Sequence, residues 1–247
     1  MMASGCFDLL AADYDRTWTN SGSGRLQRDA VWRQLLPLFR AGNTVLDLGC
    51  GTGEDASYLA RLGVRVSAID ASPVMVRIAQ SRGVSAEVGS IEGLNGLNEV
   101  FDGVISNFGA LNSVPKLSAL RHPMAGLIRS GGYLAICLMG RFCLSESLHF
   151  ARKLQFRKAV RRWKGHAYAQ RLALPVYYPS ASTVTRALTP EFRLVSRIGV
   201  GLAVPSSGIA NLSPPSLRVR GRIDACVAAW PILRAMADHQ LYIFRRR

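Results

Sequence analysis

A leucine-rich run that ends in three alternating glycines constrains this chain more than any other feature of its sequence. Residues 45–53 read VLDLGCGTG, and a helical stretch over 54–62 follows directly. Glycine lets the backbone adopt left-handed conformations and approach a ligand closely, and the N-terminus of a helix attracts negative or polar groups. The spacing therefore predicts a strand, a loop and a helix that bind a ligand through bare backbone. Taken alone, the pattern also fits a dinucleotide site.

Short β-branched runs alternate with helical stretches through the first part of the chain, a pattern typical of a parallel sheet covered by helices. Ser72 followed by Pro73 indicates a helix start, with serine as the N-cap. A turn is expected at 130–132. The expected strands are 44–48, 64–69, 84–88, 101–106, 133–139, 192–200 and 239–246, and the expected helices are 54–62, 72–81 and 116–128.

Two aspartates end the first two expected strands, where a ligand would be bound. Asp47 lies at the end of the first strand, and its alternative role is to satisfy loop amides. Asp70 ends the second strand, 17 residues after Gly53. An acid at this place can accept hydrogen bonds from ribose hydroxyls. Its alternative role is to cap the helix that begins at Ser72.

Several motifs in combination resemble the class I S-adenosylmethionine-dependent methyltransferases, particularly the group that acts on small molecules. They are VLDLGCGTG (45–53), the acidic end of VSAID, SPVMVRIAQ (72–80) and FDGVISNFGALNSV (101–114). The resemblance implies a Rossmann-like α/β fold: a seven-stranded sheet, mostly parallel, with an antiparallel last strand and helices on both faces. It also implies S-adenosylmethionine across the carboxyl ends of the first two strands, with S-adenosylhomocysteine as product.

The resemblance carries roles to individual positions of the glycine loop and the second strand. Gly49, Gly51 and Gly53 would leave room for the methionine part of the cofactor. Asp70 would bind the ribose. Ala71 and Met75 would flank the adenine.

Other family positions match through different residue types. Where the family commonly has an aspartate after the third strand, this chain has Ser90, and that side chain or the backbone near Ile91 would take its place. Asn107 and Phe108 would lie beside the sulfonium, with core packing as the alternative for Phe108. The predicted cofactor-binding residues are Tyr14, Arg25, Asp47, Gly49, Cys50, Gly51, Gly53, Asp70, Ala71, Met75, Ser90, Ile91, Asn107 and Phe108.

Two of these residues precede the glycine loop in the sequence. Tyr14 resembles an N-terminal tyrosine that covers the cofactor in many relatives, and Arg25 is the expected clamp for the cofactor's carboxylate. The alternative for both is an exposed position on the first helix.

Methyl transfer from a sulfonium is an in-line displacement, so positioning and exclusion of water supply most of the catalysis. A hydroxyl acceptor would also require a general base.

The fourth strand ends in NFGA rather than in the [DN]PP[YF] motif with which exocyclic-amine nucleic-acid methyltransferases bind a flipped base. This difference argues against a DNA or RNA adenine methyltransferase. No acidic pair suited to magnesium follows that strand, and no metal is expected. The candidate bases, each with a structural role as alternative, are His149, His166, Tyr177, Tyr178 and His239.

The net positive charge of the chain comes from its second part, residues 141–247. The sequence has 31 Lys and Arg against 16 Asp and Glu, a formal charge of +15. Residues 1–140 hold 12 of each sign, so residues 141–247 supply the whole excess. We expect one methyltransferase domain over 1–247. Its parts are a cofactor-binding core (1–140), a basic cap with helix and loop (141–190), and final strands with a lid-like excursion at 202–237 (191–247).

The basic cap contains HFARKLQFRKAVRRWKG (149–165), with seven bases from Arg152 to Lys164 on an expected helix over 141–165. Such a helix fits an anionic membrane or an acidic substrate. The alternative is a solvated helix whose apolar stripe packs on the domain. Residues 172–190, with three prolines, are expected to be mostly loop with one short helix.

Three functions follow from these patterns. The first is methylation of N or O on a small-molecule or lipid-like acceptor. The second is an RNA methyltransferase whose basic half binds phosphate, and the third is a cofactor-binding module without catalysis.

The sequence predicts a cytoplasmic protein, with peripheral membrane contact as a further expectation. The prediction rests on five scattered cysteines, an acidic N-terminal segment and the lack of 18 consecutive apolar residues. The oligomeric state does not follow from the sequence.

Overall fold

A seven-stranded sheet forms the centre of the computed structural model, in the order β3-β2-β1-β4-β5-β9-β8. The structure describes residues 4–170, 173–209 and 212–247. The strands of this sheet are β1 (Thr44–Leu48), β2 (Arg65–Asp70), β3 (Ser85–Val88), β4 (Phe101–Ser106), β5 (Ile128–Met139), β8 (Phe192–Val200) and β9 (His239–Arg246). The first five pair in parallel, whereas β9 runs antiparallel to both β5 and β8. The expected fold is confirmed.

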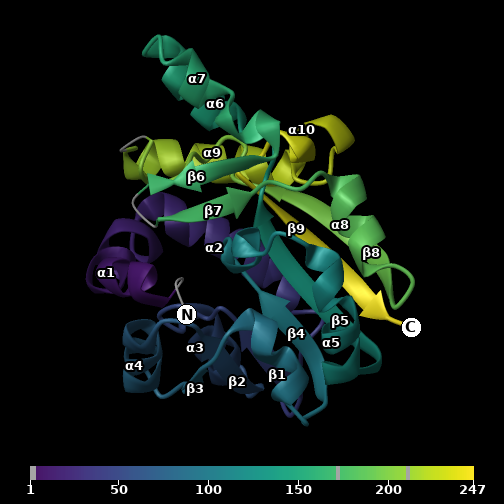
Figure 1. Cartoon of the computed structure of the whole chain (residues 1–247). Helices are drawn as coiled ribbons and strands as arrows, with labels where there is room; N and C mark the ends of the chain where they lie inside the picture. Colours follow the sequence, from purple (N-terminus) through teal and green to yellow (C-terminus); the bar gives the residue numbers. More distant parts are fainter. Residues whose placement is uncertain (1–3, 171–172, 210–211) are drawn as a thin grey trace.

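Helices cover both faces of the sheet because neighbouring side chains on a strand point to opposite faces. On the central strand β1, Leu46 packs into one core with α5 and α8, whereas Val45 packs into a second core with α2 and α3. Figure 1 shows these two layers of helices around the sheet. The helices that build them are α2 (Gly22–Leu35), α3 (Glu54–Arg61), α5 (Arg121–Leu127) and α8 (Ala181–Leu188).

Serine side chains cap three of the helices, and the predicted cap at Ser72 is one of them. Ser72 accepts a hydrogen bond from Met75 N at 3.1 Å at the start of α4 (Pro73–Ser81), with Pro73 in the first turn. Ser21 and Ser180 do the same for α2 and α8.

The first described elements are α1 (Ser4–Tyr14) and the π-helical turn η1 (Asp15–Thr19). No helix in the described ranges is both long and apolar enough to cross a bilayer.

The stretch 116–139 divides differently from the expected helix, turn and strand. A 3₁₀ turn, η4 (Leu117–Leu120), precedes α5, and β5 then begins at Ile128 rather than at Tyr133. The expected turn is an irregularity inside β5, where the pairing register with β4 shifts and Gly131 has φ +77°. Two other 3₁₀ turns, η2 (Ile91–Gly96) and η3 (Ala110–Ser113), flank β4.

The continuous helix expected over 141–165 is wrong. The chain forms α6 (Leu144–Arg152), α7 (Phe156–Ala159) and the 3₁₀ turn η5 (Arg161–Lys164). Helix α6 ends in a Schellman motif, in which Gln155 N donates to Phe150 O and Leu154 N donates to Ala151 O, both at 2.9 Å. Leu154 holds the left-handed position of that motif, with φ +56°. Sequence patterns expect glycine at this position, so the leucine gave no signal that the helix ends here.

The described part of residues 172–190 contains the expected short helix, α8, and also a strand that the sequence did not indicate. The strands β6 (His166–Ala169) and β7 (Leu174–Tyr177) form an antiparallel pair, and α8 follows. Residues 171–172 lie outside the described residues. The apolar side of β7 packs against Phe7 of α1, which brings the pair over the N-terminal helices (Figure 1).

The excursion 202–237 contains a longer helix than expected, α9 (Pro214–Val227), followed by α10 (Pro231–Ala235). Helix α9 packs against α2, and Asp224 accepts hydrogen bonds from Ala203 N and Val204 N at 2.7 and 3.1 Å. The two prolines at its start fix the backbone as a helix N-terminus requires, whereas in the sequence they suggest loop.

Candidate functional site

The glycine loop lies at the edge where β1, β2 and β4 end. Gly49 N and Cys50 N both donate to Ile69 O on β2, at 2.8 and 3.1 Å. Gly49, Gly51 and Gly53 have φ values of +71°, +54° and +77°, a region that other residues rarely adopt. The expected strand, loop and helix are confirmed, and the loop is tied to the second strand at its first turn.

The three glycines of the loop serve different purposes. A Cβ atom on Gly49 would lie 2.3 Å from the Cβ of Ala110, and one on Gly53 would lie 2.7 Å from the Cβ of Ala79. These two glycines therefore let η3 and α4 pack closely. A Cβ on Gly51 would meet nothing within 4 Å. Gly51 thus presents its backbone to open space at the strand ends, which is the arrangement a ligand cradle requires.

Asp70 connects the loop to the start of α4. Its carboxylate accepts hydrogen bonds from Gly51 N at 2.8 Å and from Ser72 N at 2.9 Å. Burial raises the pKa of Asp70, and the two backbone donors act in the opposite direction. The helix start has a second carboxylate in Asp8 of α1, which accepts from the Ser72 hydroxyl and from Val74 N. Asp70 therefore holds the glycine loop in place and also contacts the backbone at Ser72, the N-cap of α4.

The residues beside Asp70 differ in how far they reach the surface. Ala71 is half-buried, whereas the Met75 side chain is buried within the layer formed by α4. Ser90 is exposed and Ile91 is half-buried against the core. Gly89 N donates to Asp70 O at 3.0 Å, so this segment abuts the end of β2. Cys50 is half-buried, and burial raises the pKa of its thiol.

Asp47 lies behind the loop rather than at its surface. The residue is 2% exposed, and its Oδ2 atom has no hydrogen-bond partner within the described structure. Burial raises the pKa of Asp47 well above its ordinary value, and a backbone hydrogen bond from Ala56 in α3 only partly opposes this shift. Its contact with the first turn of α3 supports a structural role in holding that helix behind the loop.

Sequence reasoning missed the arginine of the site. Arg28 is buried and pairs with Asp55 of α3, with 2.8 Å between Nη1 and Oδ2. Arg25 is exposed and donates to Asn20 Oδ1 at 2.8 Å, away from this pair. Arg28 shares a helical face with the buried Val31 and Leu35, and that spacing of three and then four residues is the signal that distinguishes it from Arg25.

Arg28 also lies against an aromatic wall. Its guanidinium is 4.8 Å from the ring of Trp18 and 5.0 Å from that of Phe108, and the two rings are 4.6 Å apart. Phe108 has φ +53°, an uncommon conformation that aims its ring toward η1 and α2. Asn107 Nδ2 donates to Asp55 Oδ2 at 3.2 Å, and its Oδ1 atom is buried without a partner among the described residues.

Tyr14 stands next to this wall, 5.9 Å from the ring of Trp18. Burial raises the pKa of the Tyr14 hydroxyl; the nearby Arg28 lowers it and the carboxylates around the loop raise it further. The following turn, η1, is fixed to the loop because Thr52 Oγ1 donates to Asp15 Oδ1 at 2.8 Å. Arg82 pairs with both Asp15 and Glu54. The N-terminal helices are thus fastened across the glycine loop.

Of the five candidate bases, His239 is the one that packs on the wall. Its ring is 5.4 Å from that of Phe108, and burial lowers its pKa. His149 packs against Phe150 on α6, and His166 is exposed on β6. Tyr178 is buried over Arg162, a structural position.

Tyr177, the remaining candidate base, is half-buried at the end of β7. Its backbone carbonyl accepts from Asn112 Nδ2 at 2.5 Å, which ties the strand pair to η3 beside the loop.

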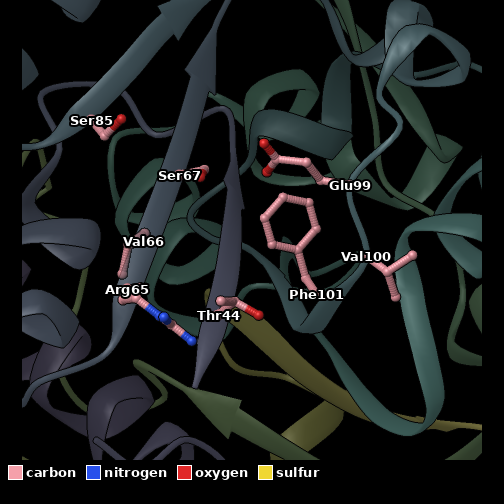
Figure 2. A pocket seen from close by; sticks show the side chains of 8 residues that line it. All are labelled: Thr44, Arg65, Val66, Ser67, Ser85, Glu99, Val100 and Phe101. Carbon is pink, nitrogen blue, oxygen red and sulfur yellow. The ribbon is translucent and has the colours of Figure 1, made fainter. Parts of the chain in front are cut away.

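A cavity of about 530 Å³ lies at the other end of the strands. It is lined by residues at the starts of β1, β2, β3 and β4, among them Thr44, Arg65 and Phe101 (Figure 2). A second cavity of about 330 Å³ lies between α2, β8 and α9. Neither cavity is lined by a residue of the predicted cofactor site.

The fold and the strand-end loop define a class. A seven-stranded sheet in this order, with an antiparallel last strand and a glycine loop after the first strand, is the fold of the class I S-adenosylmethionine-dependent methyltransferases, and this chain has that fold. Within the class, residues 45–132 match the family described as methyltransferase domain.

Demethylmenaquinone methyltransferases are among the curated proteins that this chain resembles. The protein of Mycobacterium marinum is 35% identical over 134 residues, which cover 53% of this chain and 56% of that protein. The chain spans about half the length of the curated relatives it matches.

Solved methyltransferase structures share the fold over nearly the whole chain. The N-methyltransferase NodS of Bradyrhizobium japonicum, in complex with S-adenosylhomocysteine, has a TM-score of 0.63 at 17% identity and covers 100% of this chain and 99% of its own. Magnesium protoporphyrin IX methyltransferase of Synechocystis, with the same bound product, has a TM-score of 0.56 at 15% identity and covers 92% of this chain and 84% of its own.

Proposed function

We propose that this protein transfers a methyl group from S-adenosylmethionine to N or O of a small-molecule or lipid-like acceptor. The observation that carries the proposal is the open space beside Gly51, next to the carboxylate of Asp70, at the carboxyl ends of the strands. The methyltransferase domain of residues 45–132 and the product-bound structures of similar fold support it.

The residues at the strand ends fit the cofactor's groups. Asp70 has carboxylate oxygens that can accept from ribose hydroxyls, and Gly51 offers backbone at close approach. Tyr14, Trp18 and Phe108 form an apolar wall that excludes water from the reacting atoms. The cofactor supplies an electrophilic methyl group when bound. The chain's own contribution is to orient the acceptor at near-attack distance and keep the site dry.

His239 is the residue best placed to act as base for a hydroxyl acceptor. It packs on Phe108, and its lowered pKa keeps the imidazole neutral at pH 7, the form that accepts a proton. An amine acceptor would need no base if it arrives deprotonated.

The names of the curated relatives, demethylmenaquinone methyltransferases, favour a lipid-like acceptor. Free Cys50, Cys137, Cys143 and Cys226 support a reducing, cytoplasmic location.

Calorimetric titration with S-adenosylmethionine and S-adenosylhomocysteine tests the cofactor site. We expect micromolar binding by the wild-type protein and a loss of about 100-fold or more in Asp70→Ala, which removes a charged acceptor that also holds the loop. Asp102→Ala is the matched control, because Asp102 accepts from Thr44 N at 2.7 Å at the opposite end of the strands. Equal affinity of Asp70→Ala and wild type would overturn the assignment of the ribose site.

The acceptor class is tested with labelled S-adenosylmethionine and fractionated cell extract. Label in lipid or small polar compounds supports the proposal. Label in RNA would instead support the RNA methyltransferase, for which the basic second half is the argument. Cofactor binding without transfer to any fraction would indicate a binding module.

A further inference from the structure

The segment of residues 142–168, called the basic tip from here on, exposes large apolar side chains. Leu154 is 77% exposed and Phe156 is 62% exposed. Leu148, Trp163 and Tyr168 are exposed as well. In Figure 1, α6 and α7 project from the rest of the molecule, with β6 beneath them. The apolar side chains therefore do not pack on the domain, which corrects the alternative that the sequence left open for this helix.

The same surface is strongly positive. The basic tip contains seven Lys and Arg and one acid, Glu146. Glu146 is buried and pairs with Arg161 and Arg162, at 2.7 and 2.6 Å. The remaining bases are exposed and form no ion pair within the described ranges; they are Arg152, Lys153, Arg157, Lys158 and Lys164. Positive charge thus surrounds the exposed apolar side chains.

The basic tip is fastened to the edge of the sheet that holds the site. Arg162 bridges Glu146 of α6 to Asp238, with 2.9 Å between Nη2 and Oδ1. Asp238 directly precedes His239, the residue that packs on Phe108. Within the tip, Ser147 Oγ donates to Ala159 O at 2.7 Å, so α6 and α7 are held together. The tip therefore has a defined position relative to the glycine loop.

We propose that the basic tip docks the protein on an anionic lipid bilayer, with the site edge toward the lipid. Exposed bases around Leu and aromatic side chains fit a bilayer surface, where the bases attract anionic headgroups and the apolar groups enter the acyl boundary. RNA phosphates would also attract the Lys and Arg side chains, and nucleobases would stack on the aromatic rings. RNA, however, offers no apolar phase for Leu148 and Leu154. The lipid-like acceptor named above is then drawn from the bilayer, a link that rests on the proposed function.

Sedimentation of the full-length protein with vesicles tests the docking. We expect binding to phosphatidylcholine vesicles that contain about one third phosphatidylglycerol to be at least about tenfold tighter than to pure phosphatidylcholine, and to weaken as salt rises from about 0.05 to 0.5 M. Leu154→Asn combined with Phe156→Ser should reduce it about tenfold or more at unchanged charge. Asparagine tolerates the left-handed conformation of residue 154, so the fold should survive.

The control removes two exposed apolar side chains from the opposite end of the strands. Leu62→Ser combined with Val100→Ser should bind vesicles like wild type, since these side chains are 40% and 61% exposed away from the tip. Equal binding to both vesicle types, equal binding by the tip variant and wild type, or binding to RNA but not to vesicles would overturn the proposal.

Two further measurements separate docking from catalysis. The tip variant should bind S-adenosylhomocysteine like wild type, and Asp70→Ala should bind vesicles like wild type. If the wild-type protein binds vesicles but transfers no methyl group to any fraction of the extract, the docking stands and the proposed function is overturned.

Discussion

Gly51 differs from the two glycines beside it because nothing in the structure requires its small size. Gly49 and Gly53 are needed for packing against Ala110 and Ala79, whereas the space next to Gly51 is open. Gly51 shares this property with Gly83, a positive-φ glycine at the end of α4, which has φ +77° and also has nothing within 4 Å of a built Cβ. A comparison of alanine substitutions at Gly51 and Gly83 therefore separates the cost of backbone strain from the loss of cofactor binding.

Gly51→Ala should therefore weaken cofactor binding by about tenfold or more, because a methyl group would occupy the approach to the backbone. Both Gly51→Ala and Gly83→Ala should lower the free energy of unfolding by about 1–2 kcal/mol, the cost of a left-handed alanine. Calorimetry with S-adenosylhomocysteine and urea unfolding measure the two effects. If Gly83→Ala loses affinity to the same degree, the effect is one of stability and the cradle is not at Gly51.

His239 should make the fold sensitive to mild acid. Burial lowers its pKa in the folded state below the ordinary 6.5. As pH falls through about 6.5, the unfolded chain takes up a proton that the folded state does not, so stability falls by at most about 1.4 kcal/mol per pH unit until the folded pKa is reached. His239→Gln should remove this loss between about pH 7.5 and 5.

Urea unfolding across that range measures the slope. His166→Gln is the control, because His166 is exposed on β6. An unchanged slope in His239→Gln would show that another group is responsible.

At the scale of elements, one buried arginine joins α6 to the start of β9. Arg162 and Arg161 both pair with Glu146, but the Arg162 side chain is 6% exposed and that of Arg161 is 45% exposed. Arg162 also donates to Asp238 Oδ1 and to the carbonyl oxygen of Asp238. The two neighbours therefore offer a matched test of what holds the basic tip in place.

Arg162→Met should lower the free energy of unfolding by about 3–5 kcal/mol, because it leaves the buried carboxylate of Asp238 without its arginine and leaves the buried carboxylate of Glu146 with Arg161 alone. Arg161→Met should cost less than about 1 kcal/mol, because the Arg161 side chain is 45% exposed and Glu146 keeps its pair with the buried Arg162. Urea unfolding of both variants gives the comparison. Equal losses would mean that Arg162 is replaceable and that packing alone holds the tip.

At the scale of the whole molecule, the cofactor-binding core and the final strands share one hydrophobic interior. Phe192 of β8 and Tyr242 and Phe244 of β9 pack in the same cluster as Leu46 and Val104. Strand β9 also covers the edge of β5 along its hydrogen bonds from Tyr133 to Met139. We propose that residues 1–247 form a single domain and that residues 1–140 are not an independent one.

A fragment of residues 1–140 should accordingly not fold on its own. It would expose the long, apolar edge of β5 and lose the aromatic residues that complete the core. Circular dichroism with urea unfolding tests this, with the full chain as reference. A cooperative unfolding transition in the fragment would contradict the single-domain assignment.

Sequence patterns were enough to predict the individual strands, the glycine loop, Asp70 and the Ser72 cap. These features depend on residue type and spacing within a single element or turn, whereas the seven-stranded sheet was expected from the resemblance to the class I methyltransferases. The strand boundaries of β4, β8 and β9 follow for the same reason.

Which polar residues lie together at the candidate site depends on the folding of the whole chain. It brought Arg28 rather than Arg25 to the aromatic wall, placed Asp47 behind the loop, and put His239 on Phe108. It also tied α6 to the start of β9 through the ion pairs of Arg162 with Glu146 and Asp238. Such contacts join segments far apart in sequence, and a pattern of neighbouring residues does not encode which distant partner will be present.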